Sequence, residues 1–232
     1  MTRLAQQSIL KEEVLLRLPG RVDYLPTFRA MQDFTSARTP DTPDEIWLLE
    51  HAPVFTMGLK GRSGTLTHIH DIPVVYADRG GDMTYHGPGQ LVVYVLMDMN
   101  RRGWGAKHLV TALEQAVINL LAAHHISSER RTGAPGVYTG EAKIAALGLR
   151  VRQGASYHGV AFNVDMDLTP FSYIAPCGYP GQTVTQLADL GIRLNTVTAG
   201  QNLLEELVRQ LGYTVQARAS TTSLSDPSER SD

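Results

Sequence analysis

The chain has 232 residues, of which 43% are hydrophobic and 19% charged, and its formal net charge is −2. That composition is typical of a globular protein with a sizeable core, and the near-neutral charge excludes the overall basic field of a nucleic-acid-binding protein. With a single cysteine, no apolar run near the roughly 20 residues of a bilayer span and no apolar signal-peptide centre, the sequence predicts a cytoplasmic protein without an intramolecular disulfide.

The first hundred residues are predicted to form five strands and one helix. Apolar runs bounded by turn residues predict the strands, and apolar residues at a spacing of three or four predict the helix. In chain order we expect a strand at Glu13–Leu18, a helix at Val22–Arg38, and strands at Glu45–Glu50, Val54–Gly58, Ile72–Ala77 and Gln90–Met99. The last strand is the longest apolar one and should be central to the sheet.

The second half is predicted to be a mixture of helices and antiparallel strands. We expect a helix at Gly105–His125, strands at Gly136–Tyr138, Lys143–Arg152 and Ser156–Val164, and helices at Thr183–Leu190 and Ala199–Gly212. Short turns rich in glycine separate the three strands, so these strands should form hairpins. From Arg218 onward the apolar residues disappear, and we expect one domain over residues 1–217 and a disordered tail over 218–232.

Two histidines could suggest a metal site. His68 and His70 alternate, and alternate residues of a strand share a face. No second group of ligands accompanies them at a recognisable spacing, so we interpret both as solvated loop histidines.

Residues 79–90, Arg-Gly-Gly-Asp-Met-Thr-Tyr-His-Gly-Pro-Gly-Gln, stand out because four glycines and a proline run directly into a strong strand. Glycine permits positive φ and close approach of the main chain. The stretch is either a tight surface hairpin between core strands or a turn whose main chain lies against a bound molecule. The standard phosphate-loop, zinc-helix and nucleophile-elbow signatures are absent from the sequence.

Cys177 and Lys143 are the candidate catalytic residues. Cys177 lies between Pro176 and Gly178, just ahead of the helix predicted from Thr183. A lone cysteine is often a small buried apolar residue, but a thiol near a helix N-terminus or a cation becomes a nucleophile more readily. Lys143 opens an apolar strand, where it could be partly desolvated and exchange protons. Alternatively, it extends along the apolar surface with its ammonium group in water.

Side by side, these stretches resemble the lipoyl (octanoyl) transferases of lipoate biosynthesis. The resemblance spans about residues 45–190, in the family's order. It is carried by residues 49–58 (LEHAPVFTMG), 79–90, 143–148 (KIAALG), 158–164 (HGVAFNV), 176–181 (PCGYPG) and Val184-Thr185. Asp82 and Met83 occupy variable positions of the family motif, and Ala146 stands where serine is common.

The resemblance implies an α/β fold, with a mixed β-sheet and flanking helices in a single domain, that is shared with biotin and lipoate protein ligases. It implies an acyltransferase that moves an octanoyl group from octanoyl-acyl carrier protein to a lysine of a lipoyl domain, without cofactor or metal. The implied acceptors are the lipoyl domains of 2-oxo acid dehydrogenase complexes and the glycine-cleavage carrier protein.

The resemblance also implies roles for particular residues. Cys177 would carry the acyl group as a thioester, and Lys143 would be its acid/base partner. The implied acyl-binding residues are Arg79, Gly80, Gly81, Asp82, Met83, Thr84, Tyr85, His86, Ala146, Leu147, Gly148, Gly159, Val160 and Ala161.

Three other functions remain as alternatives. One is an ATP-dependent lipoate or biotin protein ligase of the same fold, and another is a non-catalytic module that binds an acyl group or its carrier. The third is a thiol hydrolase that pairs Cys177 with His86 or His158. Because acyl carrier proteins are acidic, a transferase should also present a basic rim. The candidate clusters are Arg101, Arg102 and Lys107, or Arg130 and Arg131.

Overall fold

A computed structural model describes residues 12–61, 66–174 and 183–220 of the chain. Its strands are β1 (Glu12–Val22), β2 (Asp44–His51), β3 (Val54–Met57), β4 (His68–Ile69), β5 (Ile72–Tyr76), β6 (Met83–His86), β7 (Gln90–Leu96), β8 (Glu129–Arg131), β9 (Ala134–Thr139), β10 (Ala142–Arg152), β11 (Ala155–Asn163) and β12 (Tyr213–Ser220). Its α-helices are α1 (Tyr24–Ser36), α2 (Met99–Arg102), α3 (Ala106–Ala123) and α4 (Thr196–Leu211). Short 3₁₀ turns lie at η1 (Leu59–Gly61), η2 (Thr169–Tyr173) and η4 (Ala188–Leu190).

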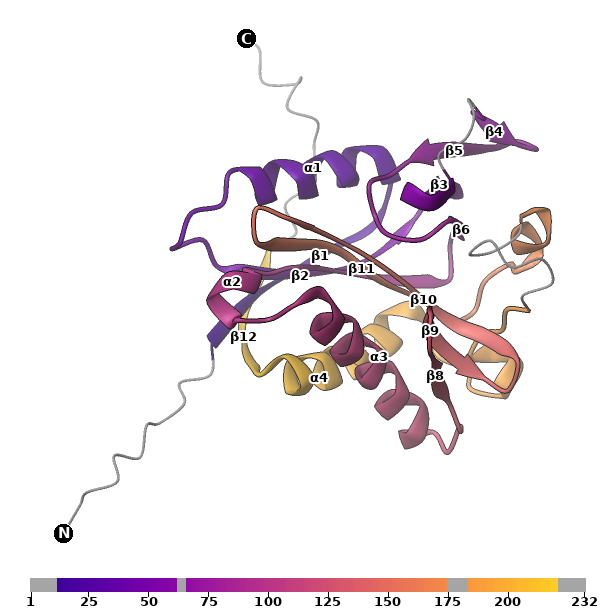
Figure 1. Ribbon diagram of the computed structural model, residues 1–232. Helices are drawn as coiled ribbons and strands as arrows, with labels where there is room; N and C mark the ends of the chain where they lie inside the picture. The colour runs from indigo at the N-terminus through magenta and orange to yellow at the C-terminus, as the bar shows by residue number, and fades with distance from the viewer. Residues whose placement is uncertain (1–11, 62–65, 175–182, 221–232) are drawn as a thin grey trace.

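An eight-stranded sheet in the order β12-β1-β2-β7-β11-β10-β9-β8 runs through the molecule (Figure 1). β1 is parallel to both β2 and β12, and the strands from β2 to β8 in this order are antiparallel. A second sheet, in the order β4-β5-β3-β6, contains four short strands. The mixed sheet with flanking helices confirms the predicted fold class.

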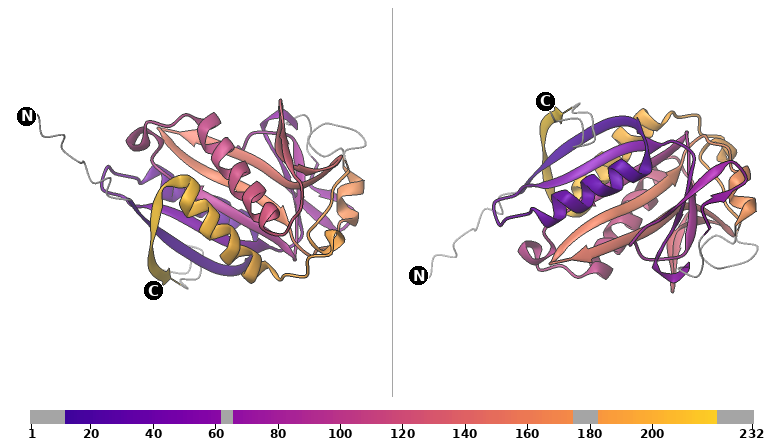
Figure 2. Two further views of the ribbon diagram at one scale, coloured as in Figure 1. Left: turned by 90° about the horizontal axis from the view of Figure 1, so that it is seen from below. Right: turned by 90° about the horizontal axis from the view of Figure 1, so that it is seen from above.

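Helices cover both faces of the large sheet. α1 lies on one face, and α3 and α4 lie side by side on the other (Figure 2). The buried residues of α3 include Leu109, Leu113, Ala116 and Leu120, which recur every three or four positions and so form one apolar stripe. The sheet side chains are divided accordingly between a core against α3 and α4 and a core against α1.

The structure confirms the predictions for the longest apolar strand and for the hairpins of the second half. β7 is buried at all seven positions and lies between β2 and β11, as expected of a central strand. β9, β10 and β11 form the predicted antiparallel hairpins, with Gly148 paired to Gly159 across the second. Among the described residues, no helix is long and apolar enough to cross a bilayer.

The prediction of a helix at Thr183–Leu190 was wrong. Residues 183–190 do not form a helix: Val184 bridges Lys143 in parallel fashion, and only Ala188–Leu190 make a 3₁₀ turn. The Lys143 amide donates a hydrogen bond to the Thr183 carbonyl, and the Lys143 carbonyl accepts one from the Thr185 amide. Those sheet-like bonds override a weak local helix preference.

Other differences concern strands. The stretch 79–90 is not all turn, because Met83–His86 form β6 and pair with β3. The first strand passes Pro19-Gly20 through an irregularity in register and continues to Val22. β4, β8 and β12 were not predicted, and β12 includes the first three residues of the expected tail, 218–220. Residues 221–232 lie outside the described part of the chain.

Candidate active site

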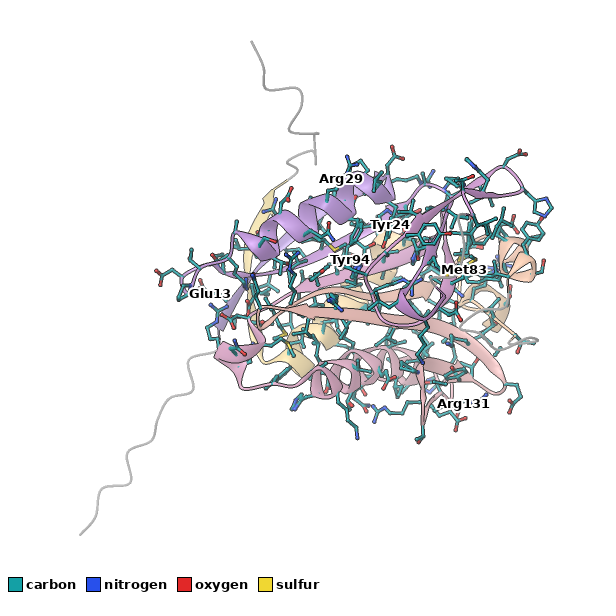
Figure 3. All side chains as sticks on the ribbon, turned by 45° about the horizontal axis from the view of Figure 1, so that its top comes forward. Glu13, Tyr24, Arg29, Met83, Tyr94 and Arg131 are labelled. Carbon is teal, nitrogen blue, oxygen red and sulfur yellow. The ribbon has the colours of Figure 1, made fainter. Side chains whose placement is uncertain are left out.

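A pocket lies between α1, β6, the 79–82 loop and the face of the sheet made by β7, β11 and β10. Tyr24 and Tyr94 lie on its lining, between α1 and the sheet (Figure 3). The full lining is Tyr24, Arg79, Gly81, Asp82, Thr84, His86, Val92, Tyr94, Ala146, Leu147, Gly148, His158, Gly159, Val160 and Ala161.

Eleven of the fourteen acyl-binding residues implied by the resemblance line this pocket. The exceptions are Gly80, Met83 and Tyr85. Side chains alternate along β6, so Met83 and Tyr85 point away from the pocket and pack in a separate apolar cluster with Phe55 and Phe171. The structure therefore brings together segments from four distant parts of the sequence.

The 79–82 loop rests on β10 at Gly148. The Gly80 amide donates to the Leu149 carbonyl at 2.9 Å, and a Cβ on Gly148 would lie 3.0 Å from the Gly80 oxygen. A side chain at this position would push the loop away from the sheet. Gly148 therefore allows the loop to close one wall of the pocket.

Arg79 holds the loop from within. Its buried guanidinium donates to the Thr56 carbonyl at 2.7 Å, the Thr56 hydroxyl at 2.9 Å and the Asp82 carbonyl at 2.8 Å. These bonds hold the positive charge of Arg79 beside the pocket. That charge disfavours protonation of the histidines nearby.

Two buried histidines, His51 and His86, are neutral at pH 7. His51 Nδ1 donates to the Val22 carbonyl at 2.9 Å, which leaves Nε2 to accept from the Tyr94 hydroxyl at 2.7 Å. Burial lowers the pKa of His51 to about 4. Burial, reinforced by the charge of Arg79, lowers the pKa of His86 well below its usual value.

His158 combines burial with unusual backbone geometry. Its φ is +62°, a conformation that only glycine adopts freely, and its side chain is 2% exposed. Nε2 donates to Asp78 at 3.0 Å, and Asp78 also accepts from Tyr157. Burial opposes ionisation of Asp78, but these hydrogen bonds outweigh it and lower its pKa to about 2. No local sequence signal singled out Asp78.

Lys143 lies at the start of β10, three residues before Ala146 of the pocket lining. It is 4% exposed, with Nζ 3.4 Å from the Pro135 carbonyl and 5.2 Å from the centre of the Tyr138 ring. The burial contradicts the alternative in which its ammonium group lies in water. Its main chain accepts from Thr185 at 3.0 Å and donates to Thr183 at 2.9 Å.

Cys177 lies outside the described residues, as does the whole of 175–182. The described chain resumes at Thr183, beside Lys143. Because residues 183–187 are not helical, the helix N-terminus that was expected to lower the pKa of the Cys177 thiol is not there.

The histidines and arginines that the sequence suggested for a metal site or a basic rim contact other residues of the protein. The ring of His70 packs on Tyr173 with centroids 4.3 Å apart, and no three His, Cys, Asp or Glu side chains gather as a metal site in the described part of the chain. Arg101 donates to Asp44 at 2.7 Å, and Arg102 lies 4.1 Å above the Tyr213 ring. Arg130 approaches Glu114 at 3.4 Å, and Arg131 approaches Glu141 at 3.1 Å. These four arginines thus contact the protein's own elements.

The chain is similar to proteins whose activity is named. Residues 23–208 match the family described as the lipoyl protein ligase A/B catalytic domain. An octanoyltransferase from Dechloromonas aromatica (strain RCB) is 58% identical over 192 residues, which cover 83% of this chain and 94% of the relative. Another from Thiobacillus denitrificans (strain ATCC 25259 / T1) is 57% identical over 198 residues, covering 85% of this chain and 91% of the relative.

Solved structures share the architecture at low identity. Lipoate-protein ligase A bound with ATP matches with a TM-score of 0.70 and 16% identity, over 93% of this chain and 91% of that one. Biotin protein ligase from Aquifex aeolicus, in complex with biotin and ATP, matches with a TM-score of 0.51 and 13% identity, over 87% and 70%. At such identities the likeness concerns the fold, and it confirms the expected biotin and lipoate protein ligase fold.

Proposed function

The chain belongs to the lipoyl protein ligase A/B catalytic domain family, and we propose that it is an acyltransferase that moves an octanoyl group from octanoyl-acyl carrier protein to a lysine of a lipoyl domain. The observation that carries this proposal is the 58% identity to an octanoyltransferase across 94% of that relative. The proposed acceptors are the lipoyl domains of 2-oxo acid dehydrogenase complexes and the glycine-cleavage carrier protein, and the proposed location is the cytoplasm.

The pocket suits the acyl chain in this proposal. Val92, Ala146, Leu147, Val160 and Ala161 supply an apolar wall. Burying methylene groups is favourable by about 0.8 kcal/mol each, so most of the affinity for an octanoyl chain would come from this wall. The reactive carbonyl would then lie toward Lys143, which precedes Ala146 on the same strand.

In the first half-reaction, the Cys177 thiolate attacks the carbonyl carbon of the donor thioester. A bond from the carbon to Sγ forms, and the bond to the carrier's sulfur breaks. The departing thiolate takes a proton from the Lys143 ammonium group. The enzyme then holds an octanoyl thioester on Cys177 and a neutral amine on Lys143.

In the second half-reaction, the amine of the acceptor lysine attacks the same carbonyl carbon. An amide bond forms, and the bond from the carbon to Sγ breaks. The neutral amine of Lys143 takes the proton that the attacking nitrogen must lose. Cys177 is again a thiolate beside a protonated Lys143, so the cycle is closed without another reactant.

A hydrolase that uses His86 as a base has less support. Nδ1 of His86 donates to Gln90 Oε1 at 2.7 Å, and Nε2 lies 3.3 Å from the Thr56 hydroxyl. The carboxamide oxygen can only accept, so the Thr56 hydroxyl donates to Nε2. Both nitrogens of His86 are therefore already hydrogen bonded.

Intact-mass analysis after incubation with octanoyl-acyl carrier protein, without ATP or metal, tests the proposal. We expect an octanoyl adduct on the wild-type protein, its transfer to an added lipoyl domain, and neither event in Cys177→Ala. Free octanoate plus ATP should give no product. ATP-dependent ligation of the free acid that survives Cys177→Ala would instead assign the chain to the ligases. An adduct lost to water faster than to the lipoyl domain would favour the hydrolase.

A further inference from the structure

A chain of buried hydrogen bonds connects the pocket to the segment that borders Lys143. It begins at Arg79, which donates to the Thr56 hydroxyl at 2.9 Å. The Thr56 hydroxyl faces His86 Nε2 at 3.3 Å, and His86 Nδ1 faces Gln90 Oε1 at 2.7 Å. Gln90 and Asn163 continue the chain, and neither is among the residues for which the resemblance implied a role.

The second part of the chain joins side-chain amides to the main chain. Gln90 Nε2 donates to Asn163 Oδ1 at 2.9 Å and to the Tyr85 carbonyl at 3.2 Å. Asn163 Nδ2 then donates to the Thr185 carbonyl at 2.9 Å. Gln90 is 1% exposed and Asn163 4% exposed, so water cannot readily replace these partners.

Every donor in this chain points in the same direction. Arg79 can only donate and the Thr185 carbonyl can only accept, so the two ends fix the orientation of each group between them. A second proton on His86 would oppose the Thr56 hydroxyl, in agreement with the lowered pKa of this buried histidine. Hydrogen bonds aligned in this way polarise one another and resist rearrangement.

The Thr185 end of this chain of hydrogen bonds determines the surroundings of Lys143. Thr185 N donates to the Lys143 carbonyl at 3.0 Å, and Lys143 N donates to Thr183 at 2.9 Å. Asn163 also binds this segment through its main chain, because its backbone carbonyl accepts a hydrogen bond from Leu187 N at 3.2 Å. Residues 183–187 thus lie between Asn163 on one side and Lys143 on the other.

We propose that Gln90 and Asn163 are positioning residues, which hold Thr185 and thereby fix Lys143 relative to the acyl pocket. The reason for two buried carboxamides, where apolar residues would pack as well, is then orientation of the proton-transfer group. This inference rests on the proposed function, because it assumes that Lys143 acts on Cys177.

The test compares Asn163→Leu with a matched control. Leucine removes the bond to Thr185 while keeping a similar volume and adding no charge. Ser156→Ala is the control, since Ser156 lies buried on the same strand and donates to the Val95 carbonyl at 2.9 Å, at the other end of β11. Gln90→Met is a second variant, which breaks the chain of hydrogen bonds one step earlier, between His86 and Asn163.

Three measurements are made on each protein: kcat and KM for octanoyl transfer, the pH midpoint of Cys177 alkylation by iodoacetamide, and Tm. We expect Asn163→Leu to lower kcat about 10- to 100-fold with KM for octanoyl-acyl carrier protein nearly unchanged. It should raise the alkylation midpoint by about one pH unit, and Gln90→Met should shift both quantities in the same direction. Ser156→Ala should lower Tm but leave kcat and the alkylation midpoint unchanged.

Variants that keep the wild-type kcat and midpoint, measured below their Tm, would overturn the inference. A lower kcat without a shifted midpoint would overturn it as well, because the defect would then lie away from Lys143. The wild-type arm reports separately on the proposed function: absence of transfer by the wild-type protein would reject that function. The alkylation midpoints would still show whether Asn163 controls the thiol.

Discussion

Lys143 is buried, although lysine is among the residue types least often buried. Its Nζ lies near the Pro135 carbonyl and the Tyr138 ring. A buried ammonium group is far more stable beside an anion. The thiolate that we propose at Cys177 would be such an anion, and each charge would then favour the other.

Lys143→Met removes this charge and keeps the aliphatic stem. The alkylation midpoint of Cys177 should rise by about one pH unit or more, because the thiolate loses its stabilising cation. Transfer should slow by about 100-fold or more, because the proton relay is lost. Lys60→Met, at an exposed lysine, is the control. An unchanged alkylation profile would leave Lys143 with a structural role alone.

The sequence identified residues whose chemistry is unusual in its local context. A lysine opening an apolar strand and a cysteine in a proline-glycine turn are visible in a few letters. Asp78, His51 and Tyr94 could not be found in this way, because each depends on a partner far along the chain. Asp78 meets His158 and Tyr157, and His51 meets Tyr94, only after the sheet has formed.

At the level of elements, two glycines that both line the pocket, Gly148 and Gly159, have different structural roles. Gly148 leaves space for the 79–82 loop. Gly159, its partner across the β10–β11 hairpin, borders the pocket but meets the neighbouring strand: a Cβ there would lie 2.1 Å from the Val93 carbonyl. The absence of a side chain at Gly159 therefore permits β11 to pair with β7.

Gly159→Ala should destabilise the protein strongly. The added methyl group would collide with backbone that cannot rotate away, and overpacking of this kind costs about 1–3 kcal/mol or more. Urea unfolding followed by circular dichroism measures the loss. Gly105→Ala is a suitable control, because a Cβ at Gly105 would meet nothing within 4 Å. Equal stability of the two variants would contradict the tight approach of β11 to β7.

The fold was largely predictable because its strands and long helices have clear periodicity. The errors have physical causes. Residues 183–190 have a helical pattern but are drawn into extended form by Lys143, and β12 is a strand because β1 offers it an edge. Both outcomes depend on pairing between distant segments, which a local pattern does not contain.

At the level of the whole molecule, three buried histidines make the fold sensitive to acid. The pKa of His51 is lowered to about 4 by burial, and the pKa values of His86 and His158 are also lowered, chiefly by burial. Between pH 6.5 and 4 the unfolded chain therefore binds protons that the folded chain does not. This part of the stability is fully present above pH 6.5 and is lost as the pH falls.

Urea unfolding at pH 8 and pH 5 measures this effect. His51 alone should account for roughly 2 kcal/mol of the lost free energy of unfolding at pH 5. His51→Gln should lower stability at pH 8 and show a smaller loss between the two pH values. His68→Gln, at an exposed histidine, should behave as the wild type does. A stability independent of pH over this range would contradict the neutral buried histidines.

The parallel pairing of β1 with β12 has a consequence for how the protein is made. β1 leaves the ribosome first, yet the outer edge of that strand pairs at Glu12 with Tyr213, close to the end of the chain. At usual rates of synthesis that edge stays open for about 10–40 s, and an open strand edge invites pairing with other chains. A chain ending at Gly212 would never close it. We expect such a chain to aggregate in a sedimentation assay, even though α3 and α4 are complete.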